Sequence, residues 1–202
     1  MSGLIKNTTG GTFLNVKQGY IVKPIKNETT GKWEVSEDNK FGSIVGMIKG
    51  MHIVDKKDPS GVNYKELQIN IAVENSDEKT KYILTHRMYK PFSDGLILSL
   101  ANNVDFSKEI KISAYTKERP NQTGLKPSTL CAVRYADSDT NISWIKDVPE
   151  PKVIKVEGEE IKSRKEKDIF IDKLVPTINE HIRTYAKVEV LDDADSDNGE
   201  ML

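Results

Sequence analysis

The sequence predicts a mainly β protein organised around a small closed barrel, and three observations lead to this fold class. Residues 67–74 alternate between apolar and polar side chains, a period of two that is typical of a half-buried strand. The strand expected before it, which starts near Phe41, is apolar on both faces around Gly46 and Gly50, where a long strand can bend or bulge. The Asp-Pro-Ser-Gly sequence at 58–61 favours a chain reversal between the two strands. A long first strand that bends is what a small barrel needs in order to close.

Further strands follow this hairpin, and one short helix interrupts them. Residues 81–88 predict a third strand, whereas residues 91–101 place their apolar side chains at helical spacing. Residues 109–115 alternate again and predict a fourth strand, and two short strands are expected at 130–135 and 142–145. This order fits the OB-fold, a five-stranded Greek-key barrel. A β-sandwich or a six-stranded barrel would give a similar pattern.

The chain divides into four predicted segments. They are an N-terminal β-arm appended at 1–40, the OB-fold barrel at 41–148, a linker and C-terminal helix at 149–187, and a disordered acidic tail at 188–202. The linker is expected at 147–156, which contains two prolines, and the helix at 159–186, where Pro176 predicts a kink or a second helix. An isolated helix of this length is marginal in water, so it needs the barrel or a second subunit of a homodimer to pack on.

The formal net charge of −1 hides an uneven distribution. No basic residue follows Lys187, whereas six acidic residues do. Removing these six from the 31 acidic residues leaves 25 against 30 basic residues, so residues 1–187 carry a net charge of about +5. A basic body with a separate acidic end is typical of a disordered interaction tail, and a merely solubilising terminus is the alternative.

The sequence offers little catalytic chemistry. Cys131 is the only cysteine, which excludes an intramolecular disulfide and a thiolate metal cluster. His52, His86 and His181 are scattered, and neither a glycine-rich phosphate loop nor a nucleophile motif is present. We therefore expect no enzymatic activity, no cofactor and no metal. Without an apolar run of about 18 residues or a signal-peptide pattern, we expect no membrane span and a cytoplasmic location.

Basic and aromatic residues are interleaved along the predicted strands and loops. Single-stranded nucleic acid is held by aromatic side chains that stack on its bases and by Lys and Arg side chains that contact its phosphates. Candidate nucleic-acid-binding residues are Trp33, Lys49, Lys57, Tyr64, Lys65, Arg87, Tyr89, Lys111, Tyr115, Lys117, Arg119 and Arg134. Five other aromatic residues, Phe13, Phe41, Phe92, Phe106 and Trp144, are assigned to packing.

The OB-like order across 41–146 and the acidic end of the chain together resemble the single-stranded DNA-binding proteins of replication and recombination, the bacteriophage group in particular. The resemblance implies an OB domain that coats and protects single-stranded DNA, without sequence preference, in the host cytoplasm. It implies that the tail recruits replication or recombination proteins and competes with DNA for the basic groove. The tail residues concerned are Asp192, Asp193, Asp195, Asp197 and Glu200. The chain ends in Met-Leu, so the partner contacts of the bacterial Asp-Phe-x-Ile-Pro-Phe ending are not implied.

Two other classes stay open at this stage. An RNA-binding OB protein would prefer RNA through contacts to the 2′-hydroxyl groups. A β-barrel interaction module would use its lysines only as solvated surface residues and would not bind oligonucleotides in a salt-dependent way.

Overall fold

The computed structural model describes residues 11–75, 78–118, 127–156 and 159–195. The centre of the fold is the long hairpin of β6 (Ser43–Lys57) and β7 (Asn63–Asn75), in agreement with the prediction. Its register shifts between Ile48 and Gly50, so the expected irregularity of β6 is a β-bulge.

Gly46 is required for a second reason, the close approach of the two strands. A Cβ atom at Gly46 would lie 2.4 Å from the carbonyl oxygen of Ala72, so no larger residue fits without a backbone shift. Gly46 pairs with Ile110, which brings the start of β6 against the neighbouring strand β9 (Ile110–Lys117). Residues 43–46 of β6 are thus paired with β9, and residues 47–57 are paired with β7 alone.

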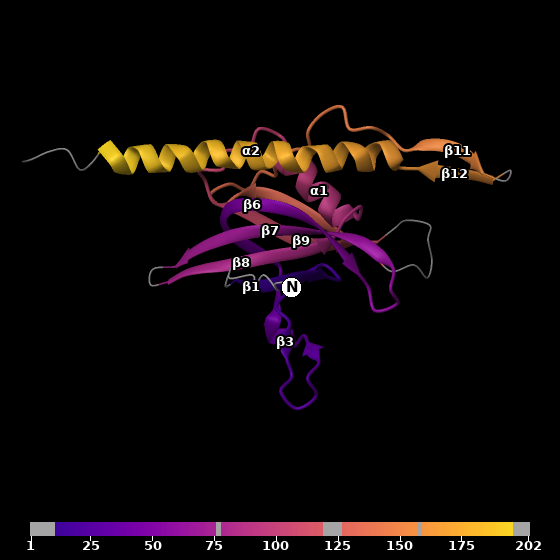
Figure 1. Cartoon of the computed structure of the whole chain (residues 1–202), viewed down its shortest axis with the longest axis horizontal. Coiled ribbons are helices and arrows are strands. Elements are labelled where there is room, and N and C mark those ends of the chain that lie inside the picture. Colours follow the sequence, from indigo (N-terminus) through magenta and orange to yellow (C-terminus); the bar gives the residue numbers. More distant parts are fainter. Residues whose placement is uncertain (1–10, 76–77, 119–126, 157–158, 196–202) are drawn as a thin grey trace, which may run out of the picture.

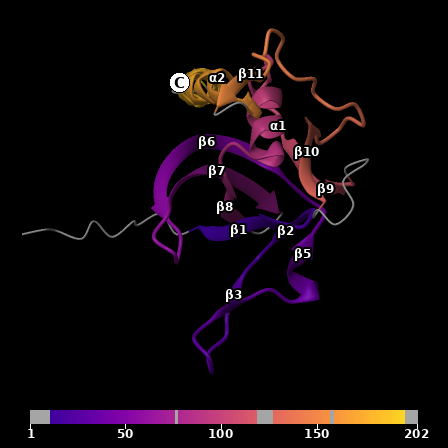
Figure 2. The same ribbon diagram turned by 90° about the vertical axis from the view of Figure 1, so that its right-hand side faces the viewer.

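The main sheet has eight strands in the order β10-β9-β6-β7-β8-β1-β2-β5. Its other members are β1 (Thr12–Lys17), β2 (Tyr20–Val22), β5 (Lys40–Phe41), β8 (Glu78–Arg87) and β10 (Ser128–Tyr135). Figure 2 shows that the sheet curls into a half-barrel. The chain is therefore mainly β, as expected, and the sheet has more strands than the predicted barrel.

The prediction of an N-terminal appendage at 1–40 is wrong for residues 12–22, whereas residues 1–10 lie outside the described part of the chain. β1 pairs in parallel with β8, and β2 and β5 extend the same sheet. Leu14 of β1 and Ile21 of β2 are buried in the common core. Only the small hairpin of β3 (Ile25–Lys26) and β4 (Trp33–Glu34) projects from the body, followed by the 3-10 helix η1 (Glu37–Asn39) (Figure 1).

The predicted short helix is confirmed as α1 (Pro91–Leu100), and all its residues from Phe92 to Leu100 are buried. The strand expected at 142–145 is not formed. Instead, this segment crosses α1: the Ile145 N–H donates to the carbonyl of Leu98 at 2.9 Å. The last carbonyls of a helix have no partner within the helix, so this contact satisfies one of them.

The predicted linker at 147–156 and the start of the predicted helix form a hairpin instead. This hairpin consists of β11 (Lys152–Val156) and β12 (Glu159–Ser163). The C-terminal helix α2 (Lys165–Asp195) then begins later than predicted and is continuous through Pro176. Its apolar stripe packs on the core, with Ile171, Ile178 and Ile182 buried and Leu174 and Tyr185 partly buried.

The acidic end of the chain also needs a correction. α2 continues to Asp195, so residues 188–195 are helical rather than disordered. Adding residues to an existing helix fixes one residue for each new hydrogen bond, and this is far easier than starting a helix. Residues 196–202, with Asp197 and Glu200, lie outside the described part of the chain.

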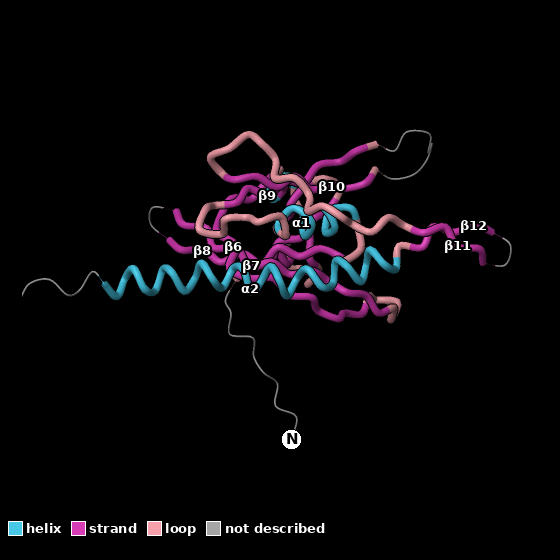
Figure 3. Tube along the Cα trace, turned by 90° about the horizontal axis from the view of Figure 1, so that it is seen from above, coloured by secondary structure: helices cyan, strands magenta, loops and turns pink. Residues whose placement is uncertain are grey.

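α2 lies along the free edge of β6 (Figures 1 and 3). Met51 points its backbone N–H and carbonyl away from β7, and the side chain of Asn179 binds both of them. The Met51 N–H donates to Asn179 Oδ1 at 2.8 Å, and Asn179 Nδ2 donates to the Met51 carbonyl at 2.7 Å. One amide side chain thus replaces a neighbouring strand at this edge.

Charged residues fix the start of α2. Asp94, which is buried in α1, accepts a hydrogen bond from Arg164 at 2.7 Å and has Lys167 at 3.5 Å. Arg164 also donates to Asp168 of α2, at 2.9 Å.

Among the described residues, no helix carries an apolar stretch long enough for a membrane crossing.

Candidate nucleic-acid interface

The outward face of β7, β8 and β1 carries the first part of the candidate site. Leu14, Leu84 and Ile69 lie opposite one another in three adjacent strands and are buried. Because side chains alternate along a strand, their neighbours Phe13 and Ile83 face outward. Phe13 is 50% exposed, which is unusual for a phenylalanine that is held in a sheet.

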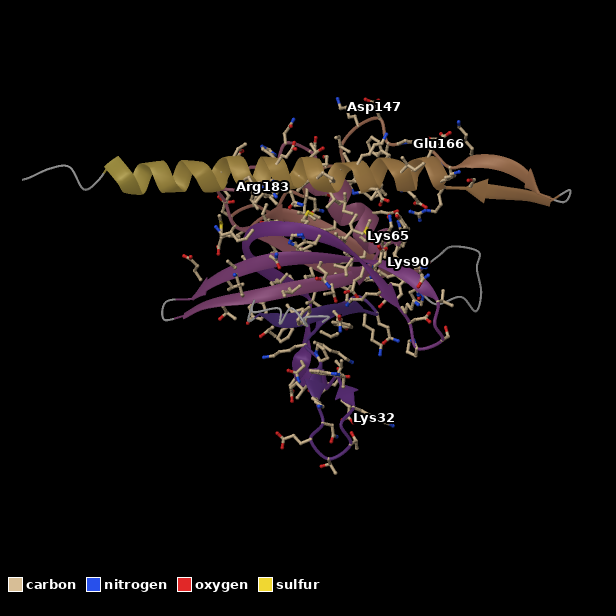
Figure 4. All side chains as sticks on the ribbon, viewed as in Figure 1. Lys32, Lys65, Lys90, Asp147, Glu166 and Arg183 are labelled. Atoms are coloured by element: carbon tan, nitrogen blue, oxygen red, sulfur yellow. The ribbon has the colours of Figure 1, made fainter. Side chains whose placement is uncertain are left out.

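An open groove of about 580 Å³ separates this face from the projecting β3–β4 hairpin. The sheet contributes Phe13, Asn15, Lys56, Glu66 and Thr85 to its lining, and the hairpin segment contributes Pro24 and Trp33. Trp33 is 69% exposed, so an aromatic ring is available on each wall of the groove. The groove lies on the side of the sheet away from α2, where Lys32 marks the hairpin in Figure 4. It is therefore accessible to a flexible chain.

The groove continues toward a second hollow of about 640 Å³ at the ends of β6, β7 and β8. Lys56 and Glu66 line the groove, and their paired neighbours across the strands, Tyr64 and Arg87, line the hollow. The guanidinium of Arg87 lies over the ring of Tyr64, 4.5 Å from its centroid. Such a stacked pair presents a flat, cationic surface to which a base can be added.

Lys65 and Tyr89 also line the hollow, but both bind α2 through Asp172. Lys65 Nζ donates to Asp172 Oδ2 at 2.9 Å, and the Tyr89 hydroxyl lies 2.9 Å from each carboxylate oxygen. The hydrogen bond to Asp172 raises the pKa of Lys65, so the ammonium form is favoured. Burial, followed by the hydrogen bond to Asp172, raises the pKa of Tyr89, which therefore remains a hydrogen-bond donor at neutral pH.

The backbone at Tyr89 directs its side chain into this contact. Tyr89 has φ +59° between β8 and α1, a left-handed conformation that costs roughly 1–2 kcal/mol for an L-residue other than glycine. The contacts of its hydroxyl with Asp172 help to hold this conformation.

Three predicted site residues form a separate group on β9 and β10. Lys111 faces Arg134 across the strand pair, and Arg134 is already held by Asp139 at 3.1 Å. Tyr115, four residues after Lys111 on β9, is 45% exposed. β6 separates this group from β7 and β8, so the structure does not bring it into the groove.

The other predicted residues are dispersed. Lys49 lies at the bulge of β6, Lys57 ends that strand, and Lys117 ends β9; all three are exposed. Arg119 lies outside the described residues. The tail residues Asp192, Asp193 and Asp195 belong to α2.

Sequence reasoning missed two contributors. Phe13 was assigned to packing, although the alternation of the TFLNVK segment with its buried Leu14 places Phe13 on the outward face. No sequence pattern pointed to Asp172, because its role depends on the docking of α2 beside residues about 100 positions earlier in the chain.

Burial shifts the pKa values of Cys131 and His86, two of the titratable side chains among the described residues. Burial raises the pKa of the Cys131 thiol, and burial lowers the pKa of His86 to about 4. Within the described ranges, no three His, Cys, Asp or Glu side chains are grouped as metal ligands.

Comparison of the chain with protein-family models, with curated proteins and with solved structures gave no significant match. The function must therefore be inferred from the chemistry of the interface.

Proposed function

We propose that this protein binds single-stranded DNA without sequence preference, in the groove between the outward face of β7, β8 and β1 and the β3–β4 hairpin. The observation that carries the proposal is the pair of exposed rings, Phe13 and Trp33, on opposite walls of one groove. Bases stack on such rings whatever their identity, and each stacked base contributes about 1–3 kcal/mol. Lys56 and Arg87 are the cations that stand nearest to the path of the phosphates.

The order of β6, β7, β8, α1, β9 and β10 supports the inference of an OB-type core. In that fold the binding face is built on the second and third strands, which correspond here to β7 and β8. We infer that β1 and β2 are additions that widen this core beside β8. The role in replication, recombination or repair belongs to the same proposal, as does the binding of partner proteins by the acidic end of the chain.

Fluorescence anisotropy with a labelled oligo-dT of about 30 nucleotides tests the proposal, beside a duplex and an RNA of equal length, over a series of salt concentrations. We expect a preference for the single DNA strand and a steep loss of affinity with salt. RNA that binds more tightly than DNA would transfer the proposal to RNA, and absence of binding to all three at low salt would refute it.

Two aromatic substitutions make the test specific. Phe13→Ala and Trp33→Ala should each weaken binding roughly 5- to 150-fold, which corresponds to about 1–3 kcal/mol for one lost stack. Trp144→Ala is the matched control, because Trp144 is also exposed (53%) but lies against Lys167 of α2 and Gly95 of α1. Equal losses from Trp33→Ala and Trp144→Ala would show that the groove is not the site.

A further inference from the structure

The hollow beside the groove contains a group of hydrogen-bond donors, and a carboxylate of the protein itself accepts hydrogen bonds from them. We propose that Lys65, Tyr89 and Lys90 form a binding site for one backbone phosphate of the single strand, and that Asp172 fills this site in the free protein. This inference rests on the proposed function and adds to it a defined phosphate contact with an internal competitor.

The geometry of Asp172 is that of a bound oxyanion. Its carboxylate accepts from the Lys65 ammonium and from the Tyr89 hydroxyl, with 2.9 Å for each contact. A backbone phosphodiester offers the same kind of acceptors in its two non-bridging oxygens, each of which can accept more than one hydrogen bond. Lys90 lines the same hollow and forms no ion pair within the described part of the chain, so it is available as a further donor to these oxygens. Figure 4 shows Lys65 and Lys90 near each other below α2.

The charge of the hollow favours an anion. Its lining contains the cations Lys65, Arg87 and Lys90 and the single carboxylate of Asp55, and Asp172 approaches from α2. The ring of Tyr64 under Arg87 stands at the same opening, so a base and its phosphate would be bound side by side.

Exchange of Asp172 for a phosphate does not require α2 to leave the sheet. The helix is held by its buried residues Ile171, Val175 and Ile178 and by the two hydrogen bonds of Asn179. The side chains of Lys65 and Asp172 are 41% and 30% exposed, so rotation of the carboxylate alone opens the site. An ion pair as exposed as this one contributes only about 0.2–1 kcal/mol, which a phosphate can readily displace.

Asp172→Asn is the decisive variant. It removes the competing charge at nearly constant size, and we expect binding of the 30-nucleotide oligo-dT at about 50 mM salt to tighten roughly two- to fivefold, the range that an exposed ion pair allows. The slope of log affinity against log salt should become steeper by about 0.7, the value for one more neutralised phosphate of a single strand.

Asp168→Asn is the matched control. Asp168 lies one turn earlier on α2 and binds Arg164 rather than the hollow, so this variant changes the net charge equally. It should alter the affinity less than twofold. Lys65→Met should weaken binding and should also abolish the gain from Asp172→Asn when the two are combined, because both changes act on one site.

Each outcome decides the matter. Three results would overturn the inference while the proposed function stands. Asp172→Asn could bind with wild-type affinity and salt slope, it could bind more weakly than the wild type, or Asp168→Asn could gain as much affinity as Asp172→Asn does. Failure of the wild-type protein to bind the oligonucleotide would instead remove the proposed function, and the inference with it. Urea denaturation of each variant confirms that the comparison is made between folded proteins.

Discussion

Replacement of Asn179 tests how α2 is attached to the sheet. In Asn179→Ala the Met51 N–H and carbonyl lose their partners at 2.8 Å and 2.7 Å. The Met51 side chain is buried and the contact is partly buried, so water replaces the lost bonds incompletely. An unsatisfied buried donor or acceptor costs about 1–3 kcal/mol, and two partly solvated groups give a loss of roughly 2–4 kcal/mol.

Equilibrium urea unfolding, followed by tryptophan fluorescence and circular dichroism, measures this loss. Asn179→Asp sharpens the experiment, because its carboxylate still accepts from the Met51 N–H but opposes the Met51 carbonyl with another acceptor. We expect Asn179→Asp to be no more stable than Asn179→Ala. Thr177→Ala is the control, since its hydroxyl is exposed and bonds only to Lys173 of the same helix. A loss below about 0.5 kcal/mol in Asn179→Ala, which is within the range of ordinary surface substitutions, would refute this account of the β6 edge.

Three further predictions concern the sheet and the groove. Burial lowers the pKa of His86 to about 4, from about 6.5 in the unfolded chain. The contribution of this shift to the free energy of unfolding is therefore complete above pH 6.5, and roughly 3 kcal/mol of stability is lost as the pH falls toward 4. The difference in urea stability between pH 7 and pH 4.5 should therefore shrink in His86→Leu, and an unchanged difference would contradict the assignment. Gly46→Ala should destabilise the protein by about 1–3 kcal/mol, because the added Cβ atom at position 46 would meet the Ala72 carbonyl oxygen. A variant as stable as the wild type would show that β6 and β7 separate easily. Arg87→Lys should retain the salt dependence of oligo-dT binding but lose affinity, since an ammonium cannot stack on Tyr64 as a guanidinium does; equal affinity would argue against a stacking role.

The sequence was informative wherever structure is encoded by neighbours in the chain. The alternation of 67–74 and the helical spacing of 91–101 predicted β7 and α1, and the glycines of β6 predicted its irregular course. These patterns are visible because each element buries one face of its own residues.

The rest depends on distant partners. The parallel pairing of β1 with β8 joins Asn15 to Thr85, 70 residues apart, and no local pattern records such a pairing. The same is true of the contact between Lys65 and Asp172. Trp33 could be selected as an exposed aromatic from its polar neighbours, whereas Phe13 could be recognised only after β1 had been placed in the sheet.

The parallel pairing of β1 has a consequence for the order in which the protein is made. β1 leaves the ribosome before the other strands that the structure describes, yet its partner in β8 follows 70 residues later. At about 5–20 residues per second, the nascent chain keeps β1 without its partner for roughly 4–14 seconds. During this time the β6–β7 hairpin, which is local in sequence, can already form. β1 can thus join β8 only after the β6–β7 hairpin has been synthesised, although β1 precedes that hairpin in the chain.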